Sequence, residues 1–271
     1  MKKLLVKTPK TLKEFVAENL KISKNRAKEI IDSKNVFVNS KRIWIASHQL
    51  KSGDVVEIIS IDSNYSETKN LEVVYEDEYI IAVNKPPFVI SDREENSLEF
   101  KLRKKYKDSK IKAIHRLDME TSGVILFAKN YDVFQEFKKL WEDKSVRKTY
   151  LAISHNEADF QIKTINTELD GKEAVSTVKL VKKANGFSYF EVYIYTGRKH
   201  QIRRHLASIR HPVVGDKIYG PKKIEIGFLK NIKRHMLHAY KLEFVHPFTK
   251  NKIMIKADIP ADFKNVLHYL K

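Results

Sequence analysis

The sequence predicts an α+β protein made of a small helix-led domain and a larger mixed sheet, mainly antiparallel, with flanking helices. Three observations predict this arrangement. Helix-like patterns come first and strand-like segments dominate the rest, a polar stretch separates the two, and 271 residues with 42% hydrophobic content suffice for a small and a large core. We expect the small domain over residues 1–62, a linker over 63–72 and the large domain over 73–271.

Two short helices are expected to open the small domain. Thr11-Leu12-Lys13-Glu14 places a hydroxyl and a carboxylate three residues apart, which is the capping-box spacing, and predicts a helix that ends near Leu20. Ser23 is expected to cap the second helix. The apolar stripe of that helix comprises Ala27, Ile30 and Ile31. The lysines that line up on another face are Lys21, Lys24 and Lys28, so the helix should present a basic stripe.

Strands complete the small domain. Val36-Phe37-Val38 indicates one strand, with Asn39-Ser40 as its turn, and Gly53-Asp54 leads into a second strand from Val55 to Ile59. The stretch that follows, residues 62–70, is polar and has no periodicity, as is typical of a linker.

The large domain is predicted as a run of strands with few helices. The strands are expected at 79–83, 124–128, 150–153, 174–180 and 189–195, and the helices at 134–141 and 201–209. In the last strand Phe190, Val192 and Ile194 alternate with polar or tyrosine side chains, which predicts a strand covered on one side only. These patterns indicate an antiparallel-rich sheet with helices packed on it.

The charge of the chain indicates a polyanionic partner. The formal net charge is +18 and the pI is about 9.7, which is typical of proteins that bind nucleic acid or membrane headgroups. Residues 198–256 hold 15 lysines and arginines against 3 acidic residues, and residues 1–62 hold 13 against 7. Because these stretches account for the whole excess, we expect the two ends to contact the polyanion and the middle to be near neutral. A solvated lysine-rich surface is the alternative.

Composition also excludes several classes of protein. With no cysteine, the chain has no disulfide, thiolate metal site or cysteine nucleophile. No apolar run approaches the about 18 residues needed to span a bilayer. The N-terminus has neither a sustained apolar stretch nor a cleavage pattern, so we do not interpret it as a secretory signal. We expect a cytoplasmic protein without membrane association.

Neither a metal nor a nucleotide cofactor is expected. His235 and His238 are three residues apart, but no cysteine and no His-Glu-x-x-His motif supports a metal site, and histidines in a basic region more often contact phosphates or the core. The isolated glycines form no phosphate cradle, so the sequence gives no sign of ATP or NAD use.

The strongest candidate for chemistry is His115-Arg116-Leu117-Asp118. It places a carboxylate beside a guanidinium in a polar loop that precedes a buried strand, and catalytic groups are commonly held on such loops. Gly123 suits a tight entry to that strand. Taken in isolation, Arg116 and Asp118 would be interpreted as a surface ion pair, so the context has to decide.

Several blocks of sequence carry a resemblance to known families. The first part resembles the small RNA-binding domain shared with a ribosomal small-subunit protein, called S-four-like here, through ISKNRAKEIIDSKNVFVNSKRI and LKSGDVVEI. The rest of the chain resembles the RluA family of RNA pseudouridine synthases. The matching blocks, in family order, are YIIAVNKPPFVIS, HRLDMETSGVILFAK, RKTYLA, GRKHQIRRHLASIRHPVVGDKIYG and RHMLHAYKLEFVHP.

This resemblance implies that Asp118 is the essential carboxylate. Uridine isomerisation breaks the bond from nitrogen 1 to the ribose, rotates the uracil and rejoins it through carbon 5. A carboxylate can attack the sugar, support an electron-poor anomeric carbon or abstract a ribose proton, and the sequence does not choose among these routes. None of them needs a cofactor.

The resemblance also implies two partners for Asp118. Arg203 would pair with it and orient it, and Tyr150 would stack against the target base. From the residues alone, a helix-surface arginine and a core tyrosine remain open alternatives.

Further residues are expected to contact RNA. Arg116 would insert where the uridine leaves the stack. His115 would bind the loop or a phosphate, and a structural histidine is the alternative. The other expected RNA contacts are Lys24, Lys28, Arg198, Lys199 and His200.

The predicted activity is therefore conversion of uridine to pseudouridine in structured RNA, ribosomal rather than transfer RNA, by a monomer without a cofactor. A binding module with an unused catalytic fold and a hydrolase that uses the same carboxylate are the alternatives. Two departures from the family affect the expected RNA preference. Lys85-Pro86-Pro87-Phe88 stands where the family has Lys-Pro, a small residue and Gly, and TLKEFVAENL lacks the usual Arg-Leu-Asp.

Overall fold

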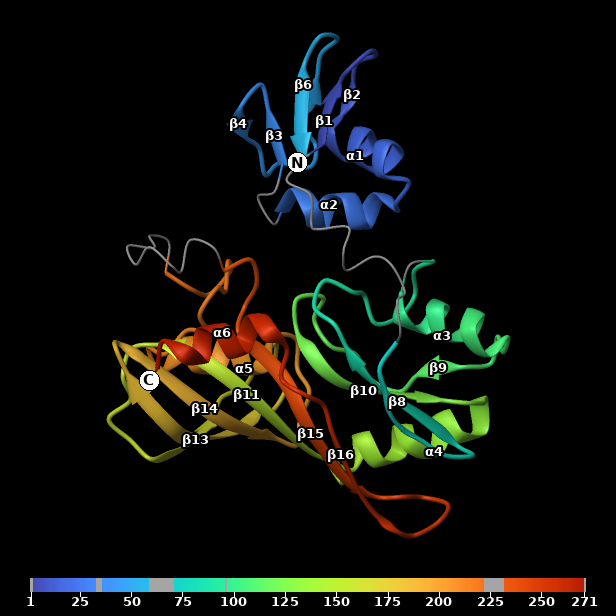
Figure 1. The fold of residues 1–271 in the computed structure, drawn as a ribbon, viewed down its shortest axis with the longest axis vertical. Helices are drawn as coiled ribbons and strands as arrows, with labels where there is room; N and C mark the ends of the chain where they lie inside the picture. Colours follow the sequence, from blue (N-terminus) through green and yellow to red (C-terminus); the bar gives the residue numbers. More distant parts are fainter. Residues whose placement is uncertain (1, 33–35, 59–70, 96, 222–231, 271) are drawn as a thin grey trace. The chain divides into compact units, whose positions relative to one another are not determined.

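The computed structural model describes residues 2–32, 36–58, 71–95, 97–221 and 232–270. The chain divides into two compact units, Met1–Glu67 and Thr68–Lys271, which we describe separately (Figure 1). The predicted linker over 63–72 lies outside the described residues except for its last two positions.

The helices of the first unit begin where the sequence predicts. At the start of α1 (Leu12–Leu20), the Thr11 hydroxyl accepts a hydrogen bond from the Glu14 N–H at 3.3 Å, and the Glu14 carboxylate accepts one from the Thr11 N–H, which confirms the capping box. The second helix, α2 (Lys24–Asp32), starts directly after Ser23 and buries Ala27 and its two isoleucines. Lys21 does not belong to it. With φ 53°, Lys21 adopts the left-handed conformation that ends α1.

The helices of the first unit share one apolar core with a four-stranded sheet. The strand order is β1 (Lys2–Leu5), β6 (Val55–Ile58), β3 (Val36–Val38) and β4 (Lys41–Arg42). A separate pair joins β2 (Lys10–Thr11) to β5 (Gln49–Leu50). Strands β3 and β6 confirm the two predicted strands, and Ile59 lies outside the described residues. The short pairings with β1, β2, β4 and β5 were not predicted.

The second unit is built on a ten-stranded sheet, and its mixed, mainly antiparallel character confirms the predicted fold class. The path of the sheet is β12-β13-β14-β11-β15-β10-β8-β7, with β16 paired to β15 and β9 paired to β10. Only the β10–β15 pairing is parallel among the described strands. The strand bounds are β7 (Val73–Glu76), β8 (Ile80–Lys85), β9 (Lys112–Ala113), β10 (Ser122–Ala128), β11 (Arg147–His155), β12 (Ile162–Asn166), β13 (Val175–Ala184), β14 (Phe187–Ile194), β15 (Leu237–Val245) and β16 (Lys252–Lys256).

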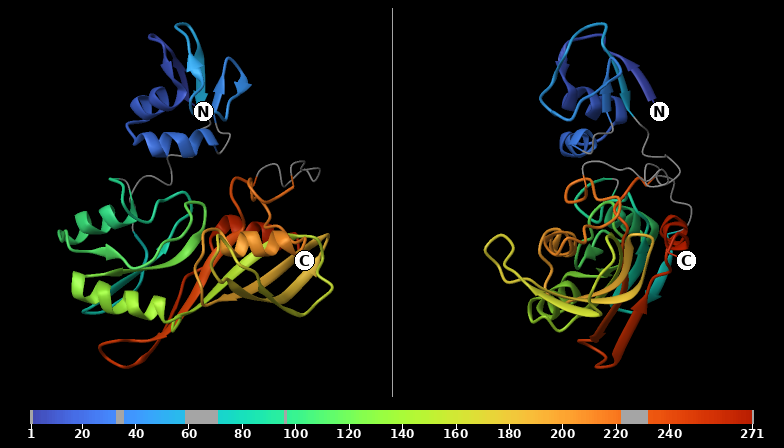
Figure 2. Two further views of the ribbon diagram at one scale, coloured as in Figure 1. Left: turned by 180° about the vertical axis from the view of Figure 1, so that it is seen from behind. Right: turned by 90° about the vertical axis from the view of Figure 1, so that its left-hand side faces the viewer.

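Helices cover both faces of this sheet. Alternate residues of β10 pack in two different clusters, one with α4 (Tyr131–Glu142) and one with α3 (Leu98–Tyr106), so the whole strand is buried. At the other end of the sheet, α5 (Gln201–Ser208) and α6 (Ala261–His268) lie on opposite faces (Figure 2). None of the helices in the described part of the chain is long and apolar enough to cross a membrane.

The predicted elements of this unit are all present, but one detail was wrong. Phe190 and Val192 of β14 are buried on the predicted face. The opposite face is also partly covered, because the Tyr189 ring packs against Phe263 of α6 with their centroids 6.4 Å apart. The expectation of a strand covered on one side only therefore fails at this point.

Candidate active site

The Asp118 loop connects β9 to β10. Leu117 is buried, whereas the Asp118 side chain is 31% exposed. Gly123 makes the tight entry to β10 that the sequence predicted. Its φ is +115°, and a Cβ at this position would lie 2.1 Å from the carbonyl oxygen of Ala239, where β10 runs parallel to β15. Only glycine allows this approach.

A buried arginine binds the Asp118 carboxylate. Arg203 lies in α5, and its Nη1 donates to Oδ2 of Asp118 at 2.9 Å while its side chain is only 5% exposed. The surface-arginine alternative is therefore wrong: α5 points this side chain into the unit rather than to solvent. The salt bridge fixes the direction of the carboxylate.

A second carboxylate, which the sequence reasoning missed, holds the arginine in place. Asp216 accepts from Nε of Arg203 at 2.6 Å and from Nη2 at 2.9 Å, and its side chain is fully buried. Burial would raise the pKa of Asp216, but the bonds to Arg203 lower it. Asp216 is one of only 3 acidic residues in the basic stretch 198–256, and this isolation was the available signal.

Tyr150 lies near Asp118 on β11. The register between β11 and β15 shifts between Thr149 and Tyr150, so a β-bulge places Tyr150 opposite Ala239, the residue that also pairs with Gly123. Bulges of this kind redirect a side chain next to a site. Burial first, and then the charge of Asp118, raise the pKa of Tyr150, which keeps its phenol protonated at neutral pH.

His200 joins the site from the residue before α5. Its Nε2 lies 3.9 Å from Oδ1 of Asp118, and its Nδ1 lies 3.1 Å from the Tyr219 hydroxyl. Asp216 in turn accepts the Tyr219 N–H at 3.0 Å. Burial lowers the pKa of His200 more than Asp118 raises it, so the ring is neutral at pH 7. The contacts of His200 and Tyr219 therefore link Asp118 to Asp216 by a second route, in addition to the one through Arg203.

The segment after β8 holds one side of the Asp118 loop. The Ser91 hydroxyl donates to the carbonyl of Leu117 at 3.0 Å and accepts its N–H at 3.1 Å. The buried amino group of Lys85 donates to the carbonyl of Met119 at 3.0 Å, as does the Phe88 N–H at 2.8 Å. Phe88 has φ 65°, the left-handed conformation that suits the glycine usual in the family. The backbone on both sides of Asp118 is thus fixed.

The other side of the loop is held from the segment before β15. Nη1 of Arg234 donates to the Glu120 carbonyl at 3.1 Å, and Lys217 lies 3.1 Å from the Glu120 carboxylate. The His235 ring binds the Thr121 hydroxyl at 2.7 Å. His238 binds Ser122 at 2.9 Å. Both histidines therefore serve the loop and strand β10, and the described residues contain no cluster of three or more metal-ligating side chains.

His115 and Arg116 diverge from one another. His115 stacks on Trp141 of α4 with ring centroids 4.9 Å apart, and its Nε2 accepts the Leu126 N–H at 3.1 Å. Burial, reinforced by Lys148, lowers its pKa to about 3, so it is neutral at physiological pH. These contacts favour the structural alternative for His115. Arg116 is exposed beside Asp118 and can reach a bound molecule.

The remaining predicted RNA contacts fall into two places. Lys199 is exposed next to His200, whereas Arg198 is half-buried and donates to the Glu173 carbonyl at 3.0 Å. Lys24 and Lys28 belong to the first unit. Both are exposed, and Lys24 pairs with Glu14 at 3.0 Å.

This arrangement can do specific chemistry. A directed carboxylate, backed by a permanently charged guanidinium, is open to solvent on one side and faces a neutral phenol and a neutral imidazole. Such a carboxylate can act as a nucleophile or base towards a sugar, and the aromatic ring offers a surface for an unpaired base.

Comparisons with known proteins identify the family of the chain. A sequence model of the family described as RNA pseudouridylate synthase matches residues 79–208, a range that includes Asp118, Tyr150 and Arg203. The chain is 32% identical over 222 residues to tRNA pseudouridine synthase C of Vibrio parahaemolyticus, covering 70% of this chain and 90% of the relative. It is 30% identical over 278 residues to ribosomal large subunit pseudouridine synthase C of Buchnera aphidicola, covering 89% and 87%.

The fold agrees as well. The structure of human RNA pseudouridylate synthase domain containing 1 matches with a TM-score of 0.61 at 24% identity, over 72% of this chain and 85% of that one. Fold, site and relatives together define an RNA-modifying isomerase. The chain belongs to the RNA pseudouridine synthases of the RluA type, and its activity is the conversion of uridine to pseudouridine in RNA.

Proposed function

We propose that Asp118 is the catalytic carboxylate of this isomerisation, with Arg203 as its orienting cation and Tyr150 as the aromatic contact of the flipped uracil. One observation supports this assignment above all. Asp118 is partly exposed, and it binds Arg203, which is buried and is itself bound by the buried Asp216. A binding-only protein has no need of a carboxylate, oriented in this way, inside a site for a polyanion.

Replacing Asp118 with Asn tests the assignment. The substitution keeps the shape and removes the charge, so we expect tritium release from RNA labelled at uridine carbon 5 to fall by at least about 1,000-fold while RNA binding persists. Asp159→Asn, an exposed aspartate of the same unit, is the matched control and should retain full activity. A D118N protein that still isomerises uridine would refute the assignment, and release of free uracil by the native protein would indicate a hydrolase.

We propose ribosomal RNA as the target. The relative named for the large ribosomal subunit aligns over 89% of this chain, more than the second unit alone can supply, whereas the relative named for tRNA covers 70%. Mapping pseudouridines in cellular RNA with and without the gene tests this proposal. Loss of sites from transfer RNA alone would contradict it.

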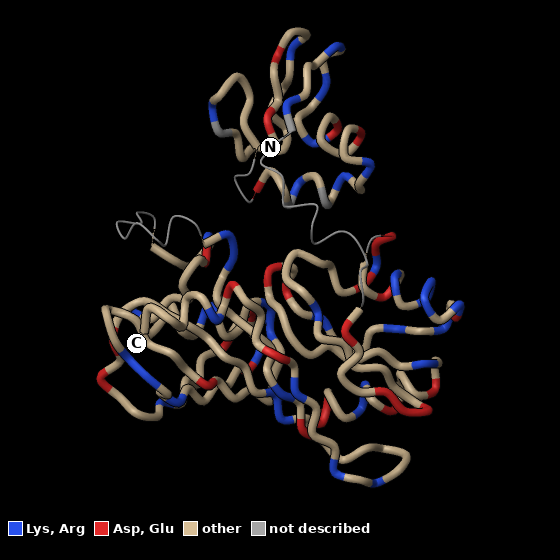
Figure 3. Tube along the Cα trace, viewed as in Figure 1, with Lys and Arg blue, Asp and Glu red and all other residues tan. Residues whose placement is uncertain are grey.

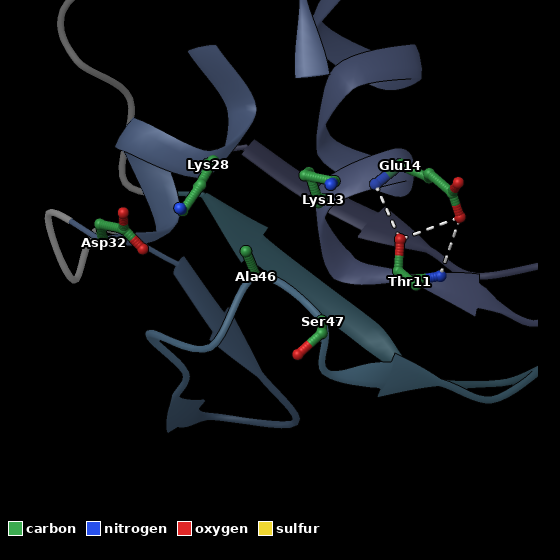
Figure 4. Close-up of a pocket in the computed structure, with 7 residues that line it drawn as sticks. All are labelled: Thr11, Lys13, Glu14, Lys28, Asp32, Ala46 and Ser47. Atoms are coloured by element: carbon green, nitrogen blue, oxygen red, sulfur yellow. Dashed lines mark hydrogen bonds between the residues drawn. The ribbon is translucent and has the colours of Figure 1, made fainter. Parts of the chain in front are cut away.

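We also propose that the first unit is an S-four-like RNA-binding domain. Lys13 of α1 and Lys28 of α2 line the same pocket on this unit (Figure 4). Lys13→Ala combined with Lys28→Ala should weaken RNA binding several-fold and reduce its salt dependence. The matched control replaces Lys3 and Lys10, which pair with Glu57 and Glu18. Equal binding by the two double variants would contradict a role of Lys13 and Lys28 in RNA recognition.

We propose that the enzyme acts as a monomer. Asp118, Tyr150, Arg203 and Asp216 all come from one chain, and the site they form needs no second copy. Sedimentation at the concentration used for activity tests this proposal, and an active dimer with an inactive monomer would contradict it.

A further inference from the structure

The segment from α3 to β9 is strongly basic, although it lies in the middle of the chain. Residues 101–112 include seven lysines and arginines and one acidic residue. The middle of the chain is near neutral in total charge, as expected. Residues 101–112 are not, and acidic residues elsewhere in the middle balance their positive charge. Lys and Arg positions follow one another along α3 and into β9 (Figure 3).

Four of these cations are exposed and form no salt bridge with a carboxylate of the described residues, namely Lys104, Lys105, Lys107 and Lys110. Lys105 also lies 5.7 Å from the centre of the Tyr106 ring, and its charge helps to lower the pKa of Glu76. We call the four lysines, together with Phe100, the α3 lysine surface. Phe100 is 44% exposed and precedes Lys104 by four positions, so both lie on one side of α3, and Lys107 is the residue that ends the helix, with φ 53°.

The lysines around α4 make a clear contrast. Lys138 lies 3.5 Å from Glu142, Lys139 lies 2.5 Å from Glu136, and Lys144 lies 2.5 Å from Glu173. Their charge is balanced locally, whereas the charge of the α3 lysine surface is not. The α4 lysines therefore form a matched control on the same unit.

The α3 lysine surface is a rigid part of the fold. Arg103 donates to the Ile111 carbonyl at 2.7 Å and pairs with Glu99 at 2.9 Å, which fastens α3 to the segment before β9. The backbone that carries these lysines therefore needs no rearrangement when phosphates bind.

The surface lies on the same face of the sheet as Asp118. The buried side of α3, Leu98 and Leu102, packs in the cluster that contains Leu117, the residue before Asp118, and the Tyr150 ring packs against this cluster. The α4 side of the sheet has its own cluster. A strand of RNA that delivers a uridine to Asp118 can therefore continue along α3.

We propose that the α3 lysine surface binds the RNA strand that flanks the target uridine, with the lysines on phosphates and Phe100 against an unpaired base. This inference rests on the proposed function and adds the place and chemistry of a further substrate contact. An RNA partner fits better than a membrane or an acidic protein, because the substrate is itself a polyanion that must reach the same face.

Replacing Lys104, Lys105 and Lys107 with Ala tests the phosphate contacts. Alanine keeps the helix, and the side chains are exposed, so folding should be retained, which thermal melting checks. We expect KM for a structured RNA to rise on the order of 10-fold and the slope of log Kd against log salt to fall by about 2. At saturating RNA, kcat should be unchanged.

The control carries alanine at Lys138, Lys139 and Lys144 and should match the native protein within about 2-fold, because locally paired cations add little. Equal KM and equal salt slopes in the two triple variants would overturn the proposal. Because the salt slope is a binding measurement, it decides this question even if the native protein released no tritium, a result that would refute the proposed function instead.

Phe100→Leu tests the stacking contact. Leucine keeps an apolar side chain but removes the aromatic face, so binding of RNA with an unpaired flank should weaken by about 5-fold or more. Binding of a fully paired duplex should not change. An equal effect on both RNAs, or none on either, would leave Phe100 without a role in base recognition.

Discussion

Two buried arginines of this enzyme have nearly the same local geometry and different tasks. Arg203 is held by Asp216 through Nε at 2.6 Å and Nη2 at 2.9 Å. Arg234 is held by Asp262 through the same two nitrogens at 2.6 Å and 3.0 Å. In each case, a bidentate carboxylate fixes the guanidinium plane and leaves Nη1 to point elsewhere.

The direction of Nη1 separates the two arginines. For Arg203 it meets the partly exposed carboxylate of Asp118, whereas for Arg234 it meets only backbone carbonyls, those of Glu120, His235 and Leu237. Arg203 therefore orients the carboxylate that we propose as the catalytic group, and Arg234 connects the backbone segments around it. The same arginine–aspartate ion pair can therefore serve chemistry or structure, and the group that Nη1 binds decides between the two.

Replacing each arginine with lysine should separate the two tasks most strongly. A lysine provides one compact point charge and lacks the planar fork by which each arginine binds its aspartate through two nitrogens while Nη1 points elsewhere. We expect Arg203→Lys to lower kcat on the order of 100-fold, because Asp118 loses its fixed direction. Arg234→Lys should lower the unfolding midpoint in urea while kcat per folded molecule changes by less than about 3-fold. Similar losses of kcat in both variants would contradict the division of tasks.

The partner aspartates should show the same contrast with smaller effects. Asp216→Asn keeps the shape of the side chain but removes the charge that balances Arg203, so the guanidinium is held less firmly, and we expect kcat to fall by about 10-fold. In Asp262→Asn the corresponding loss affects Arg234, so stability should fall and kcat should not. Single-turnover rates and urea unfolding of both variants measure this, and an active D216N with an inactive D262N would reverse our assignment.

The contrast also shows how far the sequence alone reaches. The capping box of α1 was predictable because Thr11 and Glu14 are three residues apart in the chain. Helix α3 was missed because only Leu98, Glu99 and Leu102 of its nine residues are buried, too few for a visible apolar stripe. The Arg203–Asp118 pairing came from the family resemblance, since from the residues alone a surface arginine was the better interpretation. Asp216 and the β-bulge at Tyr150 depend on contacts between distant elements, which no local pattern records.

The smallest expected effect concerns Glu120, on the structural side of the loop. Burial would raise its pKa, but hydrogen bonds to His235 and Lys217 lower it from 4.5 to about 2. A folded-state pKa below the unfolded value stabilises the protein above pH 4.5, and this stabilisation disappears as the pH falls from 4.5 towards 2.

Glu120→Gln removes this titration and isolates its effect. The native protein should exceed the variant by on the order of 1 kcal/mol in unfolding free energy at pH 7, because His235 is neutral there and the partly exposed Lys217 supplies the charge. The difference should shrink steadily as the pH falls below 4.5. Urea unfolding at several pH values measures it. Acid-sensitive groups that do not contact Glu120, such as His115, are common to both proteins and cancel in the comparison. His235 does not cancel, because burial lowers its pKa while Glu120 raises it, and its titration is part of the measured difference. A difference that stays constant down to pH 2.5 would contradict this prediction, because the bonds to His235 and Lys217 would then not depend on the charge of Glu120.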